Sequence, residues 1–162
     1  MTEVRPRGPA AGVLVRRGLL ALTVVGILAT AFELATERHW IGLEQLVPWA
    51  ALVLLAVATA LAAVPGGSGL TAARVLALVV LGASIYGVVE HVLVNFGSGA
   101  LDQRFANSWA GLPLPQRLWL AATKIVGPAP PLAPGVLGQT ALLLMLATVA
   151  ARPAAVRTAD RR

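Results

Sequence analysis

Four long stretches of the chain carry almost no charge, and this pattern constrains the fold more than any other feature. A helix needs about 20 apolar residues to cross roughly 30 Å of hydrocarbon. Each stretch is apolar on every face, whereas the strands of a membrane barrel alternate polar and apolar residues. The sequence therefore predicts four membrane-spanning helices, at about residues 18–36, 46–64, 75–94 and 132–151.

These spans predict an all-α fold, an integral membrane four-helix bundle within residues 16–151, with basic tails at 1–15 and 152–162. The composition agrees, since 57% of the 162 residues are hydrophobic and only 12% are charged. Such a chain has too little polar surface for a water-soluble enzyme domain and too many apolar residues for a disordered protein. The chain has no cysteine, which excludes disulfides and thiolate metal sites.

The basic residues predict the orientation of the bundle. Four basic residues fall on one side of the predicted membrane: Arg38, Arg104, Arg117 and Lys124. Nine fall on the other: Arg5, Arg7, Arg16, Arg17, Arg74, Arg152, Arg157, Arg161 and Arg162. The positive-inside rule places both termini in the cytoplasm, an N-in/C-in topology. The isoelectric point near 11.5 is then an orientation signal, and no nucleic-acid partner is predicted.

Twelve arginines against one lysine, with many alanines and leucines, indicate the codon bias of a GC-rich bacterial genome. The predicted location is therefore the bacterial plasma membrane. An alternative is that the first span is a cleaved signal peptide ending at Ala29-Thr30-Ala31, which would leave three spans. Residues 32–36 continue the apolar run past that position, which favours an uncleaved helix.

Most acidic residues and both histidines fall at the predicted outer end of the bundle. Span lengths place Glu33 and Glu90 about one helical turn inside the membrane surface. Ionisable residues at that depth usually face protein or water and not lipid. The candidate polar cluster at this end is Glu33, Glu37, Arg38, His39, Glu44, Glu90, His91 and Asn95.

Three interpretations of this cluster stay open. The favoured one is structural: the side chains solvate the helix ends and pair with one another, with Arg38 neutralising Glu33 or Glu90. The second is a site for a divalent cation or for proton relay. The third is a haem held axially by His39 and His91. No cofactor is predicted, and the absence of Gly-x-Ser-x-Gly, HExxH and phosphate-loop motifs predicts no catalytic residue.

The connection between the third and fourth spans, residues 96–131, is predicted to be an extracytoplasmic loop. Within it, residues 115–126 have the pattern of an amphipathic helix that lies in the membrane interface. The four tryptophans lie near predicted membrane boundaries and are expected to form an aromatic belt: Trp40, Trp49, Trp109 and Trp119. In the third span, Ser84, Gly87, His91 and Asn95 form a small and polar stripe that would let another helix approach.

Several short motifs resemble those of small four-span bacterial membrane proteins: Glu33-Leu34, Arg38-His39-Trp40, Gln45-Leu46-Val47-Pro48, Glu90-His91 and Leu132-Ala133-Pro134-Gly135. The resemblance implies a four-span fold and no particular activity. It also implies acidic residues in the loop after the third span, and of these the chain has only Asp102.

Three functions are therefore considered. The leading hypothesis is a non-enzymatic scaffold or accessory subunit in the lipid bilayer, with a membrane-protein partner or a second copy of the chain. The alternative is an ion- or proton-binding or transport protein that uses the outer Glu/His cluster. The third hypothesis is a b-type haem protein.

Overall fold

The computed structural model describes residues 9–64 and 67–150, and these residues contain helices and turns but no strand. Four of the helices are long and apolar enough to cross a membrane, and the predicted all-helical class is confirmed. The long helices are α1 Pro9–Thr36, α2 Val47–Ala63, α3 Gly67–Ser98 and α5 Ala133–Ala150. Four shorter elements connect them: η1 Glu44–Leu46, η2 Gly99–Leu101, η3 Trp109–Gly111 and α4 Leu114–Ala122.

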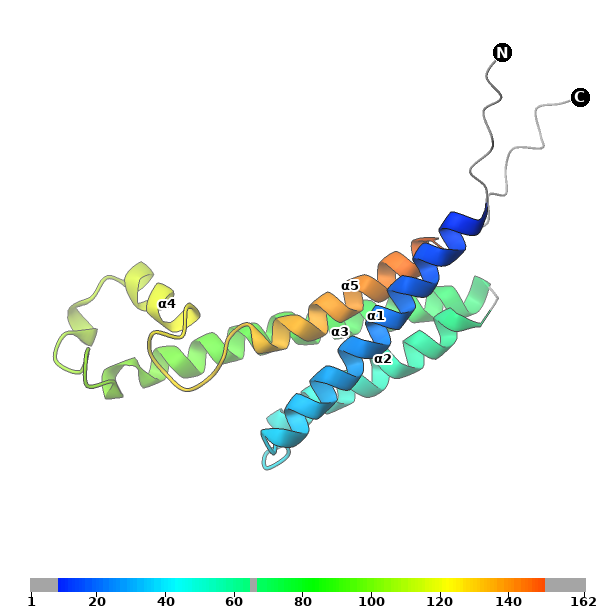
Figure 1. Cartoon of the computed structure of the whole chain (residues 1–162). Helices are drawn as coiled ribbons and strands as arrows, with labels where there is room; N and C mark the ends of the chain where they lie inside the picture. The colour runs from blue at the N-terminus through cyan, green and yellow to red at the C-terminus, as the bar shows by residue number, and fades with distance from the viewer. Residues whose placement is uncertain (1–8, 65–66, 151–162) are drawn as a thin grey trace, which may run out of the picture.

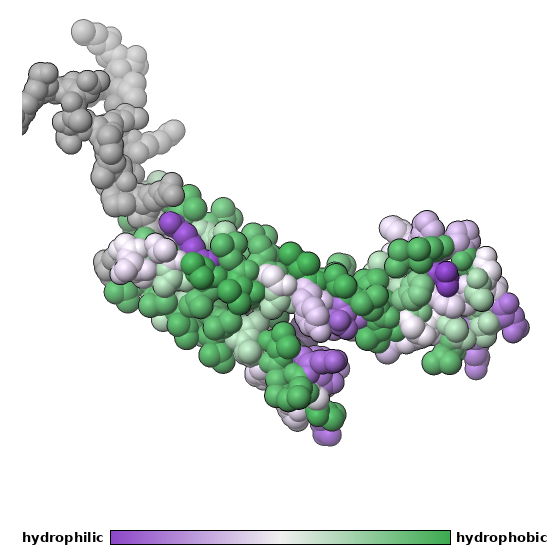
Figure 2. All heavy atoms as spheres, turned by 180° about the vertical axis from the view of Figure 1, so that it is seen from behind, coloured by the Kyte–Doolittle hydropathy of each residue, from purple (hydrophilic) through white to green (hydrophobic). Residues whose placement is uncertain are grey.

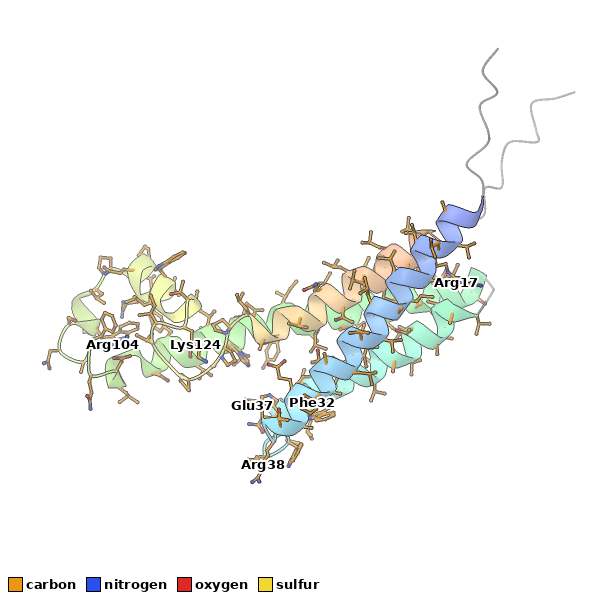
Figure 3. All side chains as sticks on the ribbon, viewed as in Figure 1. Arg17, Phe32, Glu37, Arg38, Arg104 and Lys124 are labelled. Carbon is orange, nitrogen blue, oxygen red and sulfur yellow. The ribbon has the colours of Figure 1, made fainter. Side chains whose placement is uncertain are left out.

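The four long helices form an antiparallel bundle in which α5 packs against α1, α2 and α3 (Figure 1). The end where α1 and α3 begin is called the arginine end, after Arg16, Arg17 and Arg74. The end where α1 finishes and α2 and α5 begin is called the acidic end, after Glu33, Glu37, Glu44 and Glu90. Figure 3 shows Arg17 near one end of α1 and Glu37 and Arg38 at the other.

Small residues bring the helices of the bundle close together. A Cβ added at Gly26 of α1 would meet Thr140 Oγ1 of α5 at 2.6 Å, and one at Gly138 would meet Ser84 Oγ at the same distance. Gly87 of α3 lies in the same way against the Pro134 side chain. The small stripe on α3 therefore receives α5 of the same chain. This close approach of backbones is typical of helices that associate in lipid.

Two arginines cap helix C-termini at the arginine end. Arg16 Nη2 of α1 donates to the Ala62 carbonyl near the end of α2. Arg74 of α3 donates from Nε to Thr148 Oγ1 and from Nη2 to the Thr148 carbonyl, both at 2.9 Å, near the end of α5. The last carbonyls of a helix lack internal partners and carry the negative end of its dipole, so guanidinium groups stabilise them.

Helix α3 is far longer than its predicted span. It has 32 residues, about 48 Å at 1.5 Å per residue, against roughly 30 Å of hydrocarbon in a bilayer. It runs past the start of α5 and carries the extension, defined as residues 92–127, at its far end (Figure 1). No proline occurs between Gly67 and Leu112, so nothing in the sequence stops the helix where its hydropathy falls.

The extension, which covers most of the connection predicted at residues 96–131, has a core of its own. Trp109, Leu120, Ala121 and Val126 are buried together, with Phe96 and Phe105 packed against them. The Trp109 ring meets Phe96 and Phe105 edge to face at centroid distances of 5.7 and 6.5 Å. The predicted place of Trp109 in an aromatic belt is therefore wrong, because its side chain is only 6% exposed. The predicted helix at 115–126 is α4, which ends at Ala122.

The other helix boundaries differ less from the prediction. Helix α1 begins at Pro9, inside the predicted tail 1–15, while α2 and α5 agree with their predicted spans to within a residue or two. Residues 1–8 and the tail 152–162 lie outside the described residues.

Candidate functional site

One wall of the candidate site is formed by the end of α1 and the connection to α2. Helix α1 ends in a turn in which His39 N donates to the Leu34 carbonyl at 2.9 Å and Arg38 N to the Ala35 carbonyl at 3.2 Å. Arg38 takes the left-handed conformation, with φ 51°, that such a C-terminal cap requires. The turn leaves Arg38 exposed and His39 partly buried.

Side-chain hydrogen bonds fix the connection that follows. Trp49 Nε1 of α2 donates to the His39 carbonyl at 2.7 Å, and Ile41 N donates to Gln45 Oε1 at 2.8 Å. The rings of Trp40 and Trp49 lie 6.3 Å apart. Together these contacts fix the position of η1, and with it Glu44, at the acidic end of the bundle.

The opposite wall is α3 together with the segment that enters α5. His91 Nδ1 lies 2.8 Å from the Pro130 carbonyl. Asn95 Nδ2 donates to the carbonyls of Ala121 at 3.0 Å and Ala129 at 2.7 Å, and Asn95 Oδ1 accepts from Ala129 N at 2.9 Å. The segment is thereby tied along α3. Gly127, at φ 79°, packs directly on Asn95, where a side chain would overlap it.

Between the two walls lies a cleft of about 460 Å³, called the acidic cleft. Six of the eight predicted cluster residues line it: Glu33, Glu37, His39, Glu44, Glu90 and His91. Figure 2 shows a notch between the end of the α1–α2 hairpin and the extension, with hydrophilic residues beside it and hydrophobic ones over most of the long helices. The acidic end therefore gathers these side chains from α1, the α1–α2 connection and α3.

Arg38 and Asn95, the other two predicted residues, are not among the lining residues. Asn95 is fully buried and acts structurally, through the three hydrogen bonds to residues 121 and 129. Arg38 forms no ion pair: across residues 9–64 and 67–150, the one ion pair joins Arg104 and Asp102 in the extension. The expected neutralisation of Glu33 or Glu90 by Arg38 is therefore wrong.

The acidic cleft has an uneven balance of charge. Four glutamates line it, and the one lysine or arginine among the lining residues is Lys124. Lys124 follows α4 in a left-handed cap with φ 55°, the same turn that Arg38 makes after α1. Figure 3 shows Lys124 where the extension meets the body of α3. No carboxylate of the cleft lies within ion-pairing distance of a basic group in the described part of the chain.

The carboxylates and histidines are spread around the cleft and do not converge on one point. In the described residues, no three side chains of His, Cys, Asp or Glu are grouped closely enough to hold a metal ion. The geometry thus offers separate negative charges around a volume and not a compact set of ligands.

Sequence reasoning missed Thr30 at the buried side of the cleft. Thr30 lines the cleft, is only 5% exposed, and its hydroxyl has no hydrogen-bond partner in the structure. Four other buried threonines donate to a carbonyl three or four residues earlier: Thr23, Thr59, Thr140 and Thr148. Thr30 therefore stands out in the structure, whereas the sequence offers no signal that separates it from the others.

Two further lining residues were also missed, Tyr86 and Lys124. Tyr86 precedes Glu90 by four residues, so the helical spacing that relates Glu33 to Glu37 could have identified it. Comparisons of the chain with protein-family models, with curated proteins and with solved structures give no match.

Proposed function

We propose that this chain is a multi-pass protein of the bacterial plasma membrane that binds a positively charged ligand in the acidic cleft. Four glutamates around one cleft, opposed by the single cation of Lys124, carry the proposal. Like charges gathered in a partly enclosed site repel one another, and low-dielectric walls strengthen the attraction for a counter-charge. A bound cation relieves that repulsion.

The arginine end supports a cytoplasmic location for both termini, so that the acidic cleft faces outward. Arg16, Arg17 and Arg74 lie at the arginine end, and Arg16 and Arg74 are anchored there by hydrogen bonds. Loops rich in arginine are retained on the cytoplasmic side. A ligand would therefore reach the cleft from outside the cell.

The packing of α3 against α5 weakens the scaffold or accessory-subunit hypothesis. It relied on the small stripe of α3 as a surface for a partner helix, but Ser84 and Gly87 pack against α5 and the segment that leads into it. Ser84 Oγ donates to the Pro134 carbonyl at 2.7 Å, so that stripe is occupied within the chain. The ion-binding hypothesis is favoured by the cleft itself.

Equilibrium dialysis of the purified chain in a neutral maltoside detergent tests the proposal, with labelled calcium and labelled 2-phenylethylammonium as probes. We expect saturable binding of at least one probe and weaker binding by Glu33→Gln and Glu90→Gln. The control is Asp102→Asn, which removes a carboxylate that lies outside the cleft. If neither probe binds saturably, or if Asp102→Asn weakens binding as much as Glu90→Gln, the proposal fails.

A further inference from the structure

The residues around the glutamates of the acidic cleft indicate which chemical class of cation would bind there. This inference rests on the proposed function. We propose that the cleft accepts a primary organic ammonium ion with an apolar body. The spread of the carboxylates, the size and lining of the cleft, and the unpartnered Thr30 hydroxyl support this chemistry.

The arrangement of the carboxylates disfavours a chelated metal ion. Divalent cations such as Ca²⁺ take six to eight oxygen ligands at about 2.3–2.6 Å. In the described residues no three acidic or histidine side chains are grouped for such a site. Separated carboxylates can still attract the single, less demanding charge of an ammonium group.

The size and lining of the cleft suit an organic molecule. Its volume of about 460 Å³ is within the range of roughly 300–1,000 Å³ that small-molecule sites occupy. Apolar residues lie among the acidic ones, including Pro48, Pro134 and the buried Leu137. Tyr86 is also part of the lining, and the face of an aromatic ring attracts a cation. The walls can thus cover an apolar body while the glutamates hold the charge.

Thr30 indicates a primary ammonium and not a quaternary one. A buried hydroxyl without a partner costs free energy, so its position in the lining is explained if a ligand satisfies it. Its oxygen can accept an N–H from a primary ammonium, which has three donors, whereas a quaternary ammonium has none. Glu33 follows Thr30 by three residues and so lies on the same side of α1. These two side chains define where the ammonium group would bind.

The experiment compares four probes by equilibrium dialysis against the full chain in maltoside detergent. They are 2-phenylethylammonium, its N-trimethyl quaternary analogue, neutral 2-phenylethanol and calcium. We expect the primary ammonium to bind most tightly. Thr30→Val, which is nearly isosteric, should weaken its binding about tenfold and leave the quaternary analogue unchanged, the loss expected for one hydrogen bond to a charged group. Thr30→Val should fold at least as stably as the wild type, because it removes an unsatisfied buried hydroxyl.

Lys124 provides a test with the opposite sign. Lys124→Asn removes the charge, and asparagine tolerates the left-handed conformation of this position. Loss of this competing cation should tighten binding of the primary ammonium about three- to tenfold. This is the range expected when the effective dielectric constant lies between that of a protein surface and that of water. Equal or weaker binding by Lys124→Asn contradicts the proposal.

The remaining outcomes separate the inference from the proposed function. If calcium binds and 2-phenylethylammonium does not, or if 2-phenylethanol binds equally well, the ammonium inference fails. Calcium binding that depends on Glu90 would still leave the broader proposal intact. Because phosphatidylethanolamine carries the same primary ammonium, binding is repeated in nanodiscs of this lipid and of phosphatidylcholine. Competition by the first lipid alone identifies a lipid headgroup as the ligand, and equal binding in both identifies a free amine.

Discussion

The bundle and the extension are held together by different interactions. In the bundle, alanines fill much of the core and glycines meet side chains of the neighbouring helix, as Gly138 meets Ser84. In the extension, the Trp109 ring packs among Phe96 and Phe105, and Asn95 ties three backbone groups. One region depends on close backbone approach and the other on a few large side chains.

This difference matches the general contrast between packing in lipid and packing in water. Lipid tails are as apolar as leucine, so helices gain little from burying large apolar side chains and associate through close packing of small ones. In water, burial of apolar surface provides most of the driving force for folding. A small core of large apolar side chains, such as that of the extension, is typical of a unit that folds in water.

The largest effect is expected where the extension depends on a single side chain. Trp109→Ala should destabilise the extension by about 3–5 kcal/mol, because it empties the centre of its core. Hydrogen exchange should then accelerate across residues 99–127 and remain slow in α2 and α5. Trp119→Ala is the matched control, since the Trp119 side chain is 66% exposed. Equal acceleration in the bundle would mean that the two regions fold as one unit.

Asn95 should have the next largest effect, because it joins the two regions. Asn95→Ala leaves the Ala129 N–H and the carbonyls of Ala121 and Ala129 without their partner. Loss of buried hydrogen bonds of this kind should lower the local stability of residues 121–131 by about 1–3 kcal/mol. Proteolysis within this segment is the measurement. Ser98→Ala, which removes an exposed side-chain bond to the Val94 carbonyl, should leave the cleavage rate unchanged.

How far these features follow from the sequence differs between the two regions. The bundle could be predicted because charge-poor runs of about 20 residues have few other structures open to them. The extension could not, because its core depends on contacts between Phe96, Trp109 and Val126, which are far apart in the chain and have no shared periodicity. The fall in hydropathy also did not mark the end of the helix, because α3 continues to Ser98, four residues past its predicted span.

The candidate site shows the same division. That Glu33, Glu37, Glu44 and Glu90 belong to one end of the bundle followed from the lengths of the spans. The sequence did not indicate that the Thr30 hydroxyl lacks a hydrogen-bond partner, because an ordinary helical threonine donates to a carbonyl of the preceding turn. That Arg38 forms no ion pair in the described residues was also beyond the sequence, since Arg38 occupies an exposed left-handed cap after α1.

A third prediction concerns the close packing of the bundle. Gly138→Ala should destabilise the bundle by about 1–3 kcal/mol, since the added Cβ would lie 2.6 Å from Ser84 Oγ. Gly82→Ala on α3 is the control, because no atom lies within 4 Å of its added Cβ. In an exposed helix interior that change should stabilise by about 0.5–1 kcal/mol. Thermal unfolding in detergent measures both, and opposite signs are the result that supports packing by small residues.

The smallest effect is expected at the surface of the extension, where acid should act through Asp102. Hydrogen bonds from the Arg104 side chain, then from the Arg104 backbone N–H, hold the pKa of Asp102 below its usual value. A carboxylate with a lowered pKa stabilises the folded state above its unfolded pKa, near pH 4, and this contribution is lost as the pH falls through the lowered value.

Arg104 Nη2 also donates to the Ile125 carbonyl, so the pair links the turn at 102–104 to the segment after α4. Fluorescence of Trp109, in a chain whose other tryptophans are replaced by phenylalanine, should report a slight loosening of the extension as the pH falls below about 4. Asp102→Asn should loosen the extension slightly at neutral pH and reduce that acid response. An unchanged acid response in Asp102→Asn would assign it to other carboxylates and remove Asp102 from the interactions that distinguish the extension from the bundle.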